Sequence, residues 1–408
     1  MIDDLVPRLR FDGFDQSYKK KKIRSFCSVK SGSTPLRSNK EYFRNGYIPW
    51  VKTTDLNNSL INDTEEKVTD LALKETSLKV QPVGSVLVAM YGGFKQIGRT
   101  GLLKEPSATN QALSVLNPRK DEVHSEYLQH YLNAQISRWR RFAASSRKDP
   151  NITSFDVGSF PVLFCSLEEQ QKVADFLTSI DTKISQLTEK HRLFKEYKKG
   201  VMQQIFNQQI RFKDEDGNAF PEWKEYALKE ILLLQSDSLK MGDEEIYELI
   251  TVKRGFGGVK SRGHFKGKDV LVKNQFTIHE NEFVISKRQI VHGACGLVPS
   301  ELDGAIVSNE YNVFRPVEEL LDIEYFNRFT AIPFMRRAFF TNSDGVHIEK
   351  LLFKTQGWLK TKVHLPCLEE QQKITHFLQA IDVKIKAIAE QVEQTKQFKK
   401  GLLQQMFV

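Results

Sequence analysis

A cluster of arginine and lysine residues between positions 138 and 148 has the composition of a phosphate-binding surface. Arg138, Arg140 and Arg141 surround one tryptophan, and Arg147 and Lys148 follow after a short gap. A guanidinium group donates paired hydrogen bonds to phosphate oxygens and to the edge of guanine, so dense arginine favours a nucleic-acid interface. The same residues would also suit a solvated helix end, and the sequence leaves that alternative open.

A second basic stretch lies among glycines in the other half of the chain. Five glycines between positions 255 and 267 separate its cations, and glycine lets a backbone approach a phosphate closely. We therefore predict a basic glycine-rich loop that enters a DNA groove. Lys287 and Arg288 form the next basic pair along the chain. The candidate DNA-binding residues of the stretch are Lys253, Arg254, Lys260, Arg262 and Lys266.

Single residues elsewhere complete the predicted DNA-binding set. Lys95 and Arg99 lie in a short segment that contains several glycines. Asn110 and Asn309 have the side chain that pairs with adenine, although asparagine is also common in turns, and a turn role is the preferred interpretation. Residues 19–22 are four consecutive lysines, which is too short a run for an interaction tail, so we expect a peripheral contact at most.

The sequence lacks the motifs of a catalytic site. It contains no Pro-Pro dipeptide, which the Asp/Asn-Pro-Pro-aromatic signature of adenine methyltransferases needs, and no G-x-x-x-x-G-K-[ST] phosphate loop. The pairs Asp181-x-Lys183 and Asp382-x-Lys384 resemble part of a metal nuclease site, but we interpret them as a solvated helix face. We therefore expect a binding protein with no catalytic residue, metal or cofactor of its own.

Composition places the chain among soluble globular proteins. Of its 408 residues, 40% are hydrophobic and 27% are charged, and no apolar run approaches the ~18 residues of a membrane span. The first residues lack the basic and then apolar pattern of a secretory signal. The four cysteines lie far apart, without a C-x-x-C pair, which argues against a zinc site or a disulfide framework. We expect a cytoplasmic protein.

The excess of positive charge is unevenly distributed. The net charge is +9, and residues 1–160 contain 25 basic and 17 acidic residues, whereas residues 213–367 contain 21 basic and 23 acidic residues. A basic balance suggests a polyanionic partner. In the second half, a nucleic-acid surface must therefore be a local cluster.

One segment of the chain occurs twice. Residues 167–206 and 368–407 align without a gap at an offset of 201, with 20 identities in 40 positions. Both copies begin with Leu-Glu-Glu-Gln-Gln-Lys, and the offset also aligns Leu9-Arg10-Phe11 with Ile210-Arg211-Phe212. A period this long indicates duplicated domains, each a variable block followed by the repeated segment.

The repeated segment has the heptad pattern of a long helix that pairs with another helix. A helix of ~40 residues is about 60 Å long and cannot bury its apolar seam inside one block, so we expect the two copies to pair with each other. Pairing with a partner protein is the alternative. The predicted pairing residues are Val173, Leu177, Ile180, Ile184 and Leu187 in copy one, and Ile374, Leu378, Ile381, Ile385 and Ile388 in copy two.

Antiparallel pairing would relate the two blocks by a pseudo-twofold axis. Two half-sites on duplex DNA are related in the same way, so the blocks would read a split site. Because the blocks differ in sequence, we expect the site to be asymmetric. Gly200 and Gly401 either lie inside the helices, at a cost of ~1 kcal/mol each, or end them.

The chain resembles the specificity (S) subunit of type I restriction–modification systems over essentially its full length. The two helix openings resemble that family's conserved regions, and the variable blocks resemble its two target-recognition domains. The segments that carry the resemblance in the blocks are Ser31–Leu56, Gly92–Leu102, Thr109–Pro118, Val291–Val298 and Ser308–Pro316.

The resemblance implies a non-catalytic subunit that binds double-stranded DNA. It implies two methyltransferase subunits and two ATP-dependent restriction subunits as partners, with S-adenosylmethionine, ATP and Mg²⁺ belonging to those partners. It also implies antiparallel helices. The alternative function is a coiled-coil scaffold without a sequence-specific DNA role.

We predict an α+β fold with two globular target-recognition domains separated by two long antiparallel helices, in a pseudo-twofold tandem repeat. Strands are predicted near residues 84–90 and 281–286, and helical segments at 127–142 and 320–340. The N-terminal block is expected to pack near the C-terminal helix. The predicted boundaries are 1–166 and 209–367 for the recognition domains, and 167–208 and 368–408 for the helical regions.

Overall fold

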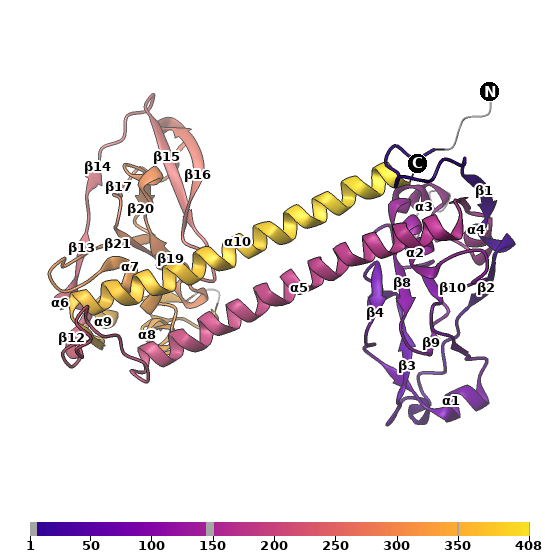
Figure 1. Cartoon of the computed structure of the whole chain (residues 1–408). Coiled ribbons are helices and arrows are strands. Elements are labelled where there is room, and N and C mark those ends of the chain that lie inside the picture. The colour runs from indigo at the N-terminus through magenta and orange to yellow at the C-terminus, as the bar shows by residue number, and fades with distance from the viewer. Residues whose placement is uncertain (1–5, 144–150, 349–350, 408) are drawn as a thin grey trace. The chain divides into compact units, whose positions relative to one another are not determined.

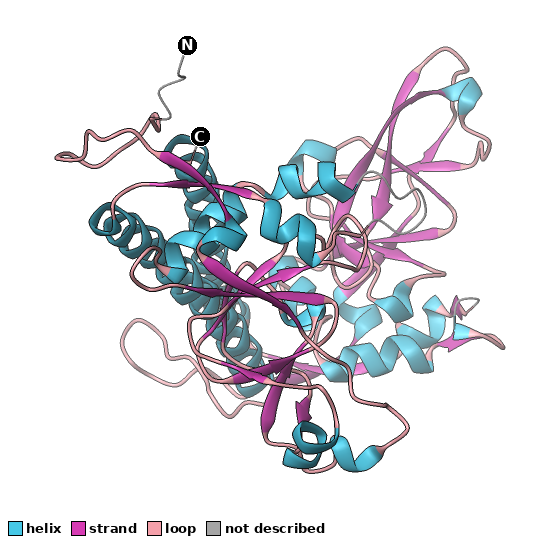
Figure 2. Cartoon of the chain, turned by 90° about the vertical axis from the view of Figure 1, so that its right-hand side faces the viewer, coloured by secondary structure: helices cyan, strands magenta, loops and turns pink. Residues whose placement is uncertain are grey.

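The computed structural model describes residues 6–143, 151–348 and 351–407. The chain divides into two compact units, of which the first comprises Met1–Lys190 with Ile388–Val408 and the second comprises His191–Ala387. Each unit mixes strands with short helices and contains part of both long helices (Figures 1 and 2). The predicted α+β tandem-repeat fold is confirmed.

The repeated segments form the two long helices α5 (Leu167–Phe206) and α10 (Leu368–Met406). Gly200 and Gly401 lie inside these helices, so the predicted alternative of a helix break is wrong. Both helices are amphipathic, and among the described residues no helix combines the length and the apolar character that a membrane crossing requires.

The first unit is built on two sheets. One has the strand order β2-β10-β7-β8-β4 and the other β5-β3-β9-β6, while β1 pairs with β11. The strands are β1 (Lys19–Lys22), β2 (Cys27–Ser31), β3 (Ile48–Val51), β4 (Ser59–Ile61), β5 (Lys67–Val68), β6 (Val80–Gln81), β7 (Val86–Ala89), β8 (Thr100–Leu103), β9 (Ser107–Thr109), β10 (Leu113–Pro118) and β11 (Pro161–Phe164). The shorter helices are α1 (Asp70–Glu75), α2 (Ser125–Ala134), α3 (Ile136–Ala143) and α4 (Ser154–Ser159).

The second unit repeats this plan with longer strands in one sheet. Its sheets have the orders β13-β21-β18-β19 and β14-β17-β20-β15-β16, while β12 pairs with β24 and β22 with β23. The strands are β12 (Lys224–Ala227), β13 (Leu232–Gln235), β14 (Ser238–Leu239), β15 (Ile246–Val252), β16 (Val259–Lys266), β17 (Gln275–Thr277), β18 (Phe283–Ser286), β19 (Cys295–Leu297), β20 (Ile306–Ser308), β21 (Tyr311–Pro316), β22 (Ser343–Asp344), β23 (Leu352–Phe353) and β24 (Lys362–Leu365). The shorter helices are α6 (Leu228–Ile231), α7 (Ile323–Phe329), α8 (Pro333–Thr341) and α9 (Thr355–Trp358).

The duplication therefore reaches into the variable blocks, where the sequences have diverged. The order β2-β10-β7-β8 matches β13-β21-β18-β19, and a parallel pair, β3 with β9 or β15 with β20, lies at the centre of each second sheet. The predicted helical segments each divide into two helices, α2 with α3 and α7 with α8. The second division precedes Pro333, because proline disfavours helical geometry at the residue before it.

In each unit, the early part of one long helix packs against the late part of the other, which is antiparallel pairing. In the first unit, Val173, Leu177 and Ile180 share a core with Leu402 and Met406, and Ile184 packs against that core. In the second unit, Ile374, Leu378 and Ile381 share a core with Val201 and Ile205, and Ile385 packs against it. Leu187 and Ile388 are also buried. The N-terminal segment packs near the C-terminal helix as expected, since Leu9 N donates to Gln405 O at 3.0 Å and Phe11 packs against the first core.

The identical openings of the two long helices hold buried polar contacts to the globular domains. Glu169 accepts hydrogen bonds from Arg10 Nε at 2.7 Å and from Tyr18 Oη at 2.9 Å. In the second unit, the Glu370 carboxylate accepts from Arg211 Nη2 at 2.8 Å and from Trp223 Nε1 at 3.1 Å. The residue after each glutamate bonds to backbone, as Gln371 does with Asp322 N at 2.9 Å. The repeated Glu-Gln pair thus fixes each domain to the start of its helix.

The aspartates of the two Asp-x-Lys pairs form ion pairs between the long helices, so the interpretation of the pairs as a solvated face is wrong for Asp181 and Asp382, whereas Lys183 and Lys384 are exposed. Lys399 Nζ lies 2.5 Å from Asp181 Oδ1 in the first unit. Lys198 Nζ lies 2.5 Å from Asp382 Oδ1 in the second unit. Lys198 and Lys399 each lie three positions before a seam residue, Val201 or Leu402, and so face the partner helix. Their carboxylate partners explain how an ammonium is accommodated there.

Each of these ion pairs has a basic neighbour from the globular domain, and the neighbour differs between the units. Arg328 Nη1 donates to Asp382 at 2.8 Å in the second unit. At the matching position of the first unit, His130 Nδ1 lies 3.9 Å from Asp181 Oδ2. Burial and the nearby Lys399 ammonium lower the pKa of His130 to about 3. Asp181 does not offset this because Lys399 already occupies its carboxylate.

The first unit is therefore expected to lose stability in mild acid. His130 has an ordinary unfolded pKa near 6.5, so the unfolded chain binds a proton that the folded chain rejects as the pH falls from 6.5 towards 3. The expected loss is about 2 kcal/mol at pH 5. Hydrogen exchange at pH 7 and pH 5, corrected for intrinsic rates, measures both units at once. His130→Gln should remove the loss of stability of the first unit between pH 7 and pH 5. If the variant loses as much stability as wild type, His130 is not the group responsible.

Candidate nucleic-acid interface

The basic glycine-rich stretch of the second unit is a β-ribbon, so its prediction as a loop is wrong. Strands β15 and β16 pair antiparallel from Ile246↔Lys266 to Val252↔Val259. Only residues 253–258 turn, with positive φ at Gly255, Phe256 and Gly258. The many glycines suggested a loop, but every second residue of β16 is a basic side chain that is exposed. These side chains are Lys260, Arg262, His264 and Lys266. A two-stranded ribbon is one of the elements that fit the major groove of DNA.

The turn of this ribbon lies against the turn between β18 and β19. Gly255 N donates to His292 O at 2.7 Å, and Phe256 N donates to Gly293 O at 2.8 Å. The two turns can approach this closely only with glycine at position 296 of β19, because a Cβ added to Gly296 would lie 2.7 Å from Gly258 Cα. The structure therefore brings the turn that carries Lys253 and Arg254 beside the turn that begins with Lys287 and Arg288.

Helix α8 places Arg336 beside these two basic turns. The sequence analysis did not predict this arginine as a DNA-binding residue. Its guanidinium carbon lies 4.7 Å from the centre of the Phe256 ring, so the arginine covers the turn of the ribbon. Helix α8 occupies the place in the second unit that α3 occupies in the first. The Arg-Arg dipeptides at 140–141 and 336–337 thus fall on matching helices, a signal that could have identified Arg336.

The predicted cations of the second unit differ in whether an acid already neutralises them. Arg288 pairs with Glu310 at 2.7 Å, which raises the pKa of the arginine through a side-chain hydrogen bond. Lys266 lies 3.1 Å from Glu244. Lys287 Nζ donates to a backbone carbonyl, Asn309 O. By contrast, three exposed cations form no ion pair within the described part of the chain, and these are Lys253, Lys260 and Arg262.

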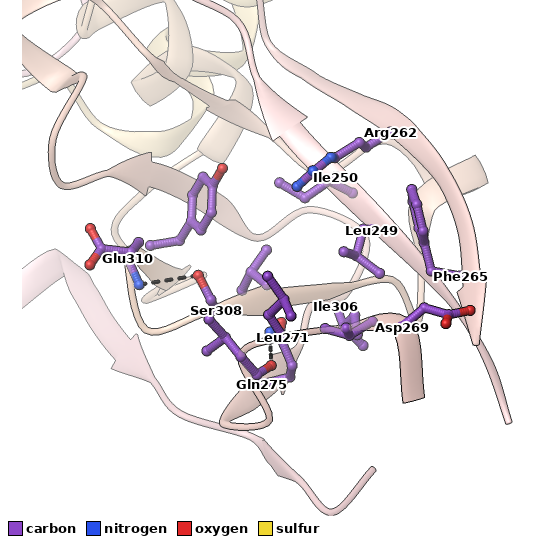
Figure 3. A pocket seen from close by; sticks show the side chains of 14 residues that line it. Leu249, Ile250, Arg262, Phe265, Asp269, Leu271, Gln275, Ile306, Ser308 and Glu310 are labelled. Atoms are coloured by element: carbon purple, nitrogen blue, oxygen red, sulfur yellow. Dashed lines mark hydrogen bonds between the residues drawn. The ribbon is translucent and has the colours of Figure 1, made fainter. Parts of the chain in front are cut away.

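Arg262 borders an open pocket on the same ribbon (Figure 3). The pocket has a volume of about 390 Å³, and Leu249 and Ile306 contribute apolar walls. Leu271, on the loop that closes one side, is 97% exposed. Burial raises the pKa of Tyr311 in the same pocket, so its hydroxyl stays protonated and can donate a hydrogen bond. A guanidinium beside apolar groups can donate to guanine while the walls contact a thymine methyl.

The matching turn of the first unit, between β7 and β8, carries Lys95 and Arg99. Gly98 in this turn lies against helix α3, since an added Cβ would be 2.6 Å from Trp139 Cδ1. Trp139 is fully buried and stacks on Phe160 at 3.9 Å. The half-buried Arg138 guanidinium lies 5.2 Å from the centre of the Phe160 ring. The fold therefore brings Lys95 and Arg99 close to the helix that bears Arg138.

The remaining predicted residues of the first unit are only partly described. Arg140 and Arg141 belong to α3, and the structure describes only their backbone. Arg147 and Lys148 lie outside the described residues. The four lysines at 19–22 form strand β1, and Lys21 pairs with Glu122 at 2.9 Å.

The candidate asparagines and metal ligands have simpler roles. Asn110 Oδ1 accepts from Ala112 N at 3.1 Å, which is a turn contact. Asn309 is exposed, and its backbone oxygen accepts from Lys287 Nζ. Within residues 6–143, 151–348 and 351–407, no group of three or more histidine, cysteine, aspartate or glutamate side chains could hold a metal ion.

Comparison with known proteins identifies relatives of both halves. The family model for the type I restriction modification DNA specificity domain matches residues 16–193 and 221–396. The MjaIX specificity subunit of Methanocaldococcus jannaschii is 29% identical over 239 residues, 56% of this chain and 54% of that protein. The EcoprrI specificity subunit of Escherichia coli is 23% identical over 389 residues, 89% of this chain and 87% of that protein. The chain thus spans about half the length of the MjaIX protein and 39% of the EcoR124I/EcoR124II specificity subunit of Escherichia coli.

Solved structures share the fold at low sequence identity. The S subunit of a type I restriction–modification system from M. genitalium has a TM-score of 0.59 and 14% identity, with 99% of each chain covered. A chain from a study of complex assembly in the type I system has a TM-score of 0.57 and 15% identity, with 96% of this chain and 97% of that chain covered. At these identities the likeness establishes the fold.

Proposed function

Because the chain belongs to the family of type I restriction modification DNA specificity domains, we propose that it is the subunit that reads DNA sequence for a type I restriction–modification enzyme. The observation that carries the proposal is the repeated basic turn. In both units, the turn that follows the matching strands β7 or β18 lies close to a second basic element, which is the helix that bears Arg138 in the first unit and the ribbon turn that carries Lys253 in the second. Two such surfaces in one chain suit two half-sites on one duplex.

The two surfaces have different residues, so the proposed target is asymmetric and in two parts. The second unit presents a long β-ribbon with Lys260 and Arg262, whereas β5, the matching strand of the first unit, has only two residues. Cations that lack an acidic partner are available to phosphates and guanine edges. We assign Lys253, Lys260 and Arg262 to this role in the second unit, and Lys95, Arg99 and Arg138 in the first.

The proposed subunit is non-catalytic and acts with partners. Two methyltransferase subunits would modify adenine, and two restriction subunits would translocate and cut DNA. S-adenosylmethionine, ATP and Mg²⁺ would serve those partners. The exposed faces of α5 and α10 supply surface for such partners. These assignments extend what is known of the family to this chain.

Methylation-aware sequencing tests the function directly. A host that expresses the chain with its methyltransferase subunit should acquire N6-methyladenine in one split motif with two unlike halves, and the vector control should not. The catalytically inactive methyltransferase is the second control. A continuous or palindromic motif would contradict the proposal that two unlike domains each read one half-site. The controls are that the complex assembles and that the same methyltransferase is active with a known specificity subunit. If both hold and no new methylated motif appears, the chain is better described as a scaffold without a DNA-reading role.

A further inference from the structure

A basic groove lies within the second unit, between the late part of α5 and the start of α8. It has a volume of about 670 Å³. Lysines 195, 198 and 199 line one side, Arg336 lines the other, and Met202 and Ile332 contribute apolar surface. Lys195, Lys199 and Met202 share one face of α5 because residues three and four apart are neighbours on a helix. No aspartate or glutamate lines the groove, whose lining residues are all described.

Most of the positive charge in the groove is not neutralised by the protein. Lys198 is paired with Asp382 at 2.5 Å, which leaves three cations. Lys195 and Lys199 are exposed, and Arg336 Nε donates to a backbone carbonyl, Ala331 O, at 2.9 Å. In the described part of the chain, none of these three forms an ion pair. A concave surface with several cations attracts an anion with several charges.

Arg336 joins the groove to the proposed DNA-reading surface. Its guanidinium covers Phe256 at the turn of the β-ribbon, and the backbone of Phe256 is hydrogen-bonded to Gly293 in the next basic turn. A duplex held at these turns therefore passes beside the groove. An acidic protein segment would match the charge as well, but it would not explain why the groove continues into the reading surface.

We propose that this groove binds backbone phosphates of the DNA that flanks the half-site read by the second unit. The proposal rests on the proposed function. Lys195 and Lys199 act as point charges on α5, and Arg336 contributes from α8. Such contacts position a duplex without reading bases. Helix α5 is then a DNA-contacting element in addition to its pairing role.

The test is the salt dependence of DNA affinity of the complex between this chain and its methyltransferase subunits. The variant combines Lys195→Gln, Lys199→Gln and Arg336→Gln, and the probe is a duplex oligonucleotide that contains the methylated motif. Each lost phosphate contact reduces the slope of log affinity against log salt by about 0.9. Between 50 mM and 200 mM salt, wild type should therefore lose about 40-fold more affinity than the variant.

The matched control replaces three exposed lysines of the same unit that lie outside the groove and outside the long helices, Lys224, Lys229 and Lys360, with glutamine. It should keep the wild-type slope. If wild type fails to bind its motif, the proposed function is wrong. If wild type binds and the groove variant keeps the same slope, the groove inference alone is wrong. If the groove variant no longer assembles with the methyltransferase, as measured by its mass in solution, the groove docks a protein and the inference is overturned.

Discussion

Replacing Glu370 with alanine is expected to lower the free energy of unfolding of the second unit by about 3–5 kcal/mol. The carboxylate is fully buried, and it accepts hydrogen bonds from Arg211 Nη2 at 2.8 Å and from Trp223 Nε1 at 3.1 Å. Without it, the buried Trp223 indole loses its acceptor, and the largely shielded Arg211 guanidinium keeps only backbone carbonyls and the exposed Glu222. Neither group regains full contact with water. The loss should appear as faster hydrogen exchange throughout the second unit and as a lower urea midpoint.

The neighbouring Glu369 provides the control, because it has the same chemistry in an exposed position. Glu369→Ala should change stability by less than about 0.5 kcal/mol. Glu370→Gln retains an acceptor for Trp223 but not the charge for Arg211, so its effect should be intermediate. Equal stabilities of Glu369→Ala and Glu370→Ala would show that the repeated glutamate does not fix the domain to its helix.

The sequence predicts the parts of this fold whose contacts depend on the spacing of three or four residues along a helix. The apolar spacing that identified the two helices also picked out Val173 and Leu177, which lie in one core with Leu402, because a helix buries residues three and four positions apart whatever its partner is. The duplication was visible because 20 of 40 positions are identical. The pairing of Asp181 with Lys399 was missed because its members are 218 positions apart. Only the antiparallel register brings them together.

The proposed DNA-reading surface was harder to predict because it is assembled from turns on different strands. Glycines around Lys260 suggested a loop, yet glycine does not prevent a strand when its neighbours alternate and a partner strand is present. Arg336 was overlooked because its helix is remote in sequence from the ribbon that it covers. The close approach of Gly258 to Gly296 carries no sequence signal beyond two glycines. That contact nevertheless determines which basic turns are adjacent.

Gly296→Val should separate the two basic turns of the second unit and weaken recognition of one half-site. A Cβ at position 296 would lie 2.7 Å from Gly258 Cα and 3.5 Å from Val259 N, so the obstacle is backbone and cannot rotate away. Overpacking of this kind costs about 1–3 kcal/mol, and here the strain is relieved by moving the turn of the ribbon. Lys253 and Arg254 would then leave their place beside Lys287 and Arg288. In the methylation assay, one half of the motif should become degenerate while the other half keeps its bases.

Gly401→Ala separates this effect from a general response to losing a glycine. Its added Cβ meets no other atom within 4 Å, and the residue lies inside α10. The substitution should stabilise the helix by up to about 1 kcal/mol and leave both half-sites intact. If Gly296→Val remains folded and the motif stays sharp in both halves, reading does not depend on the adjacency of the turns. Recognition would then have to reside on the β-ribbon itself, at Lys260 and Arg262, whose strand pairing with β15 the substitution does not touch.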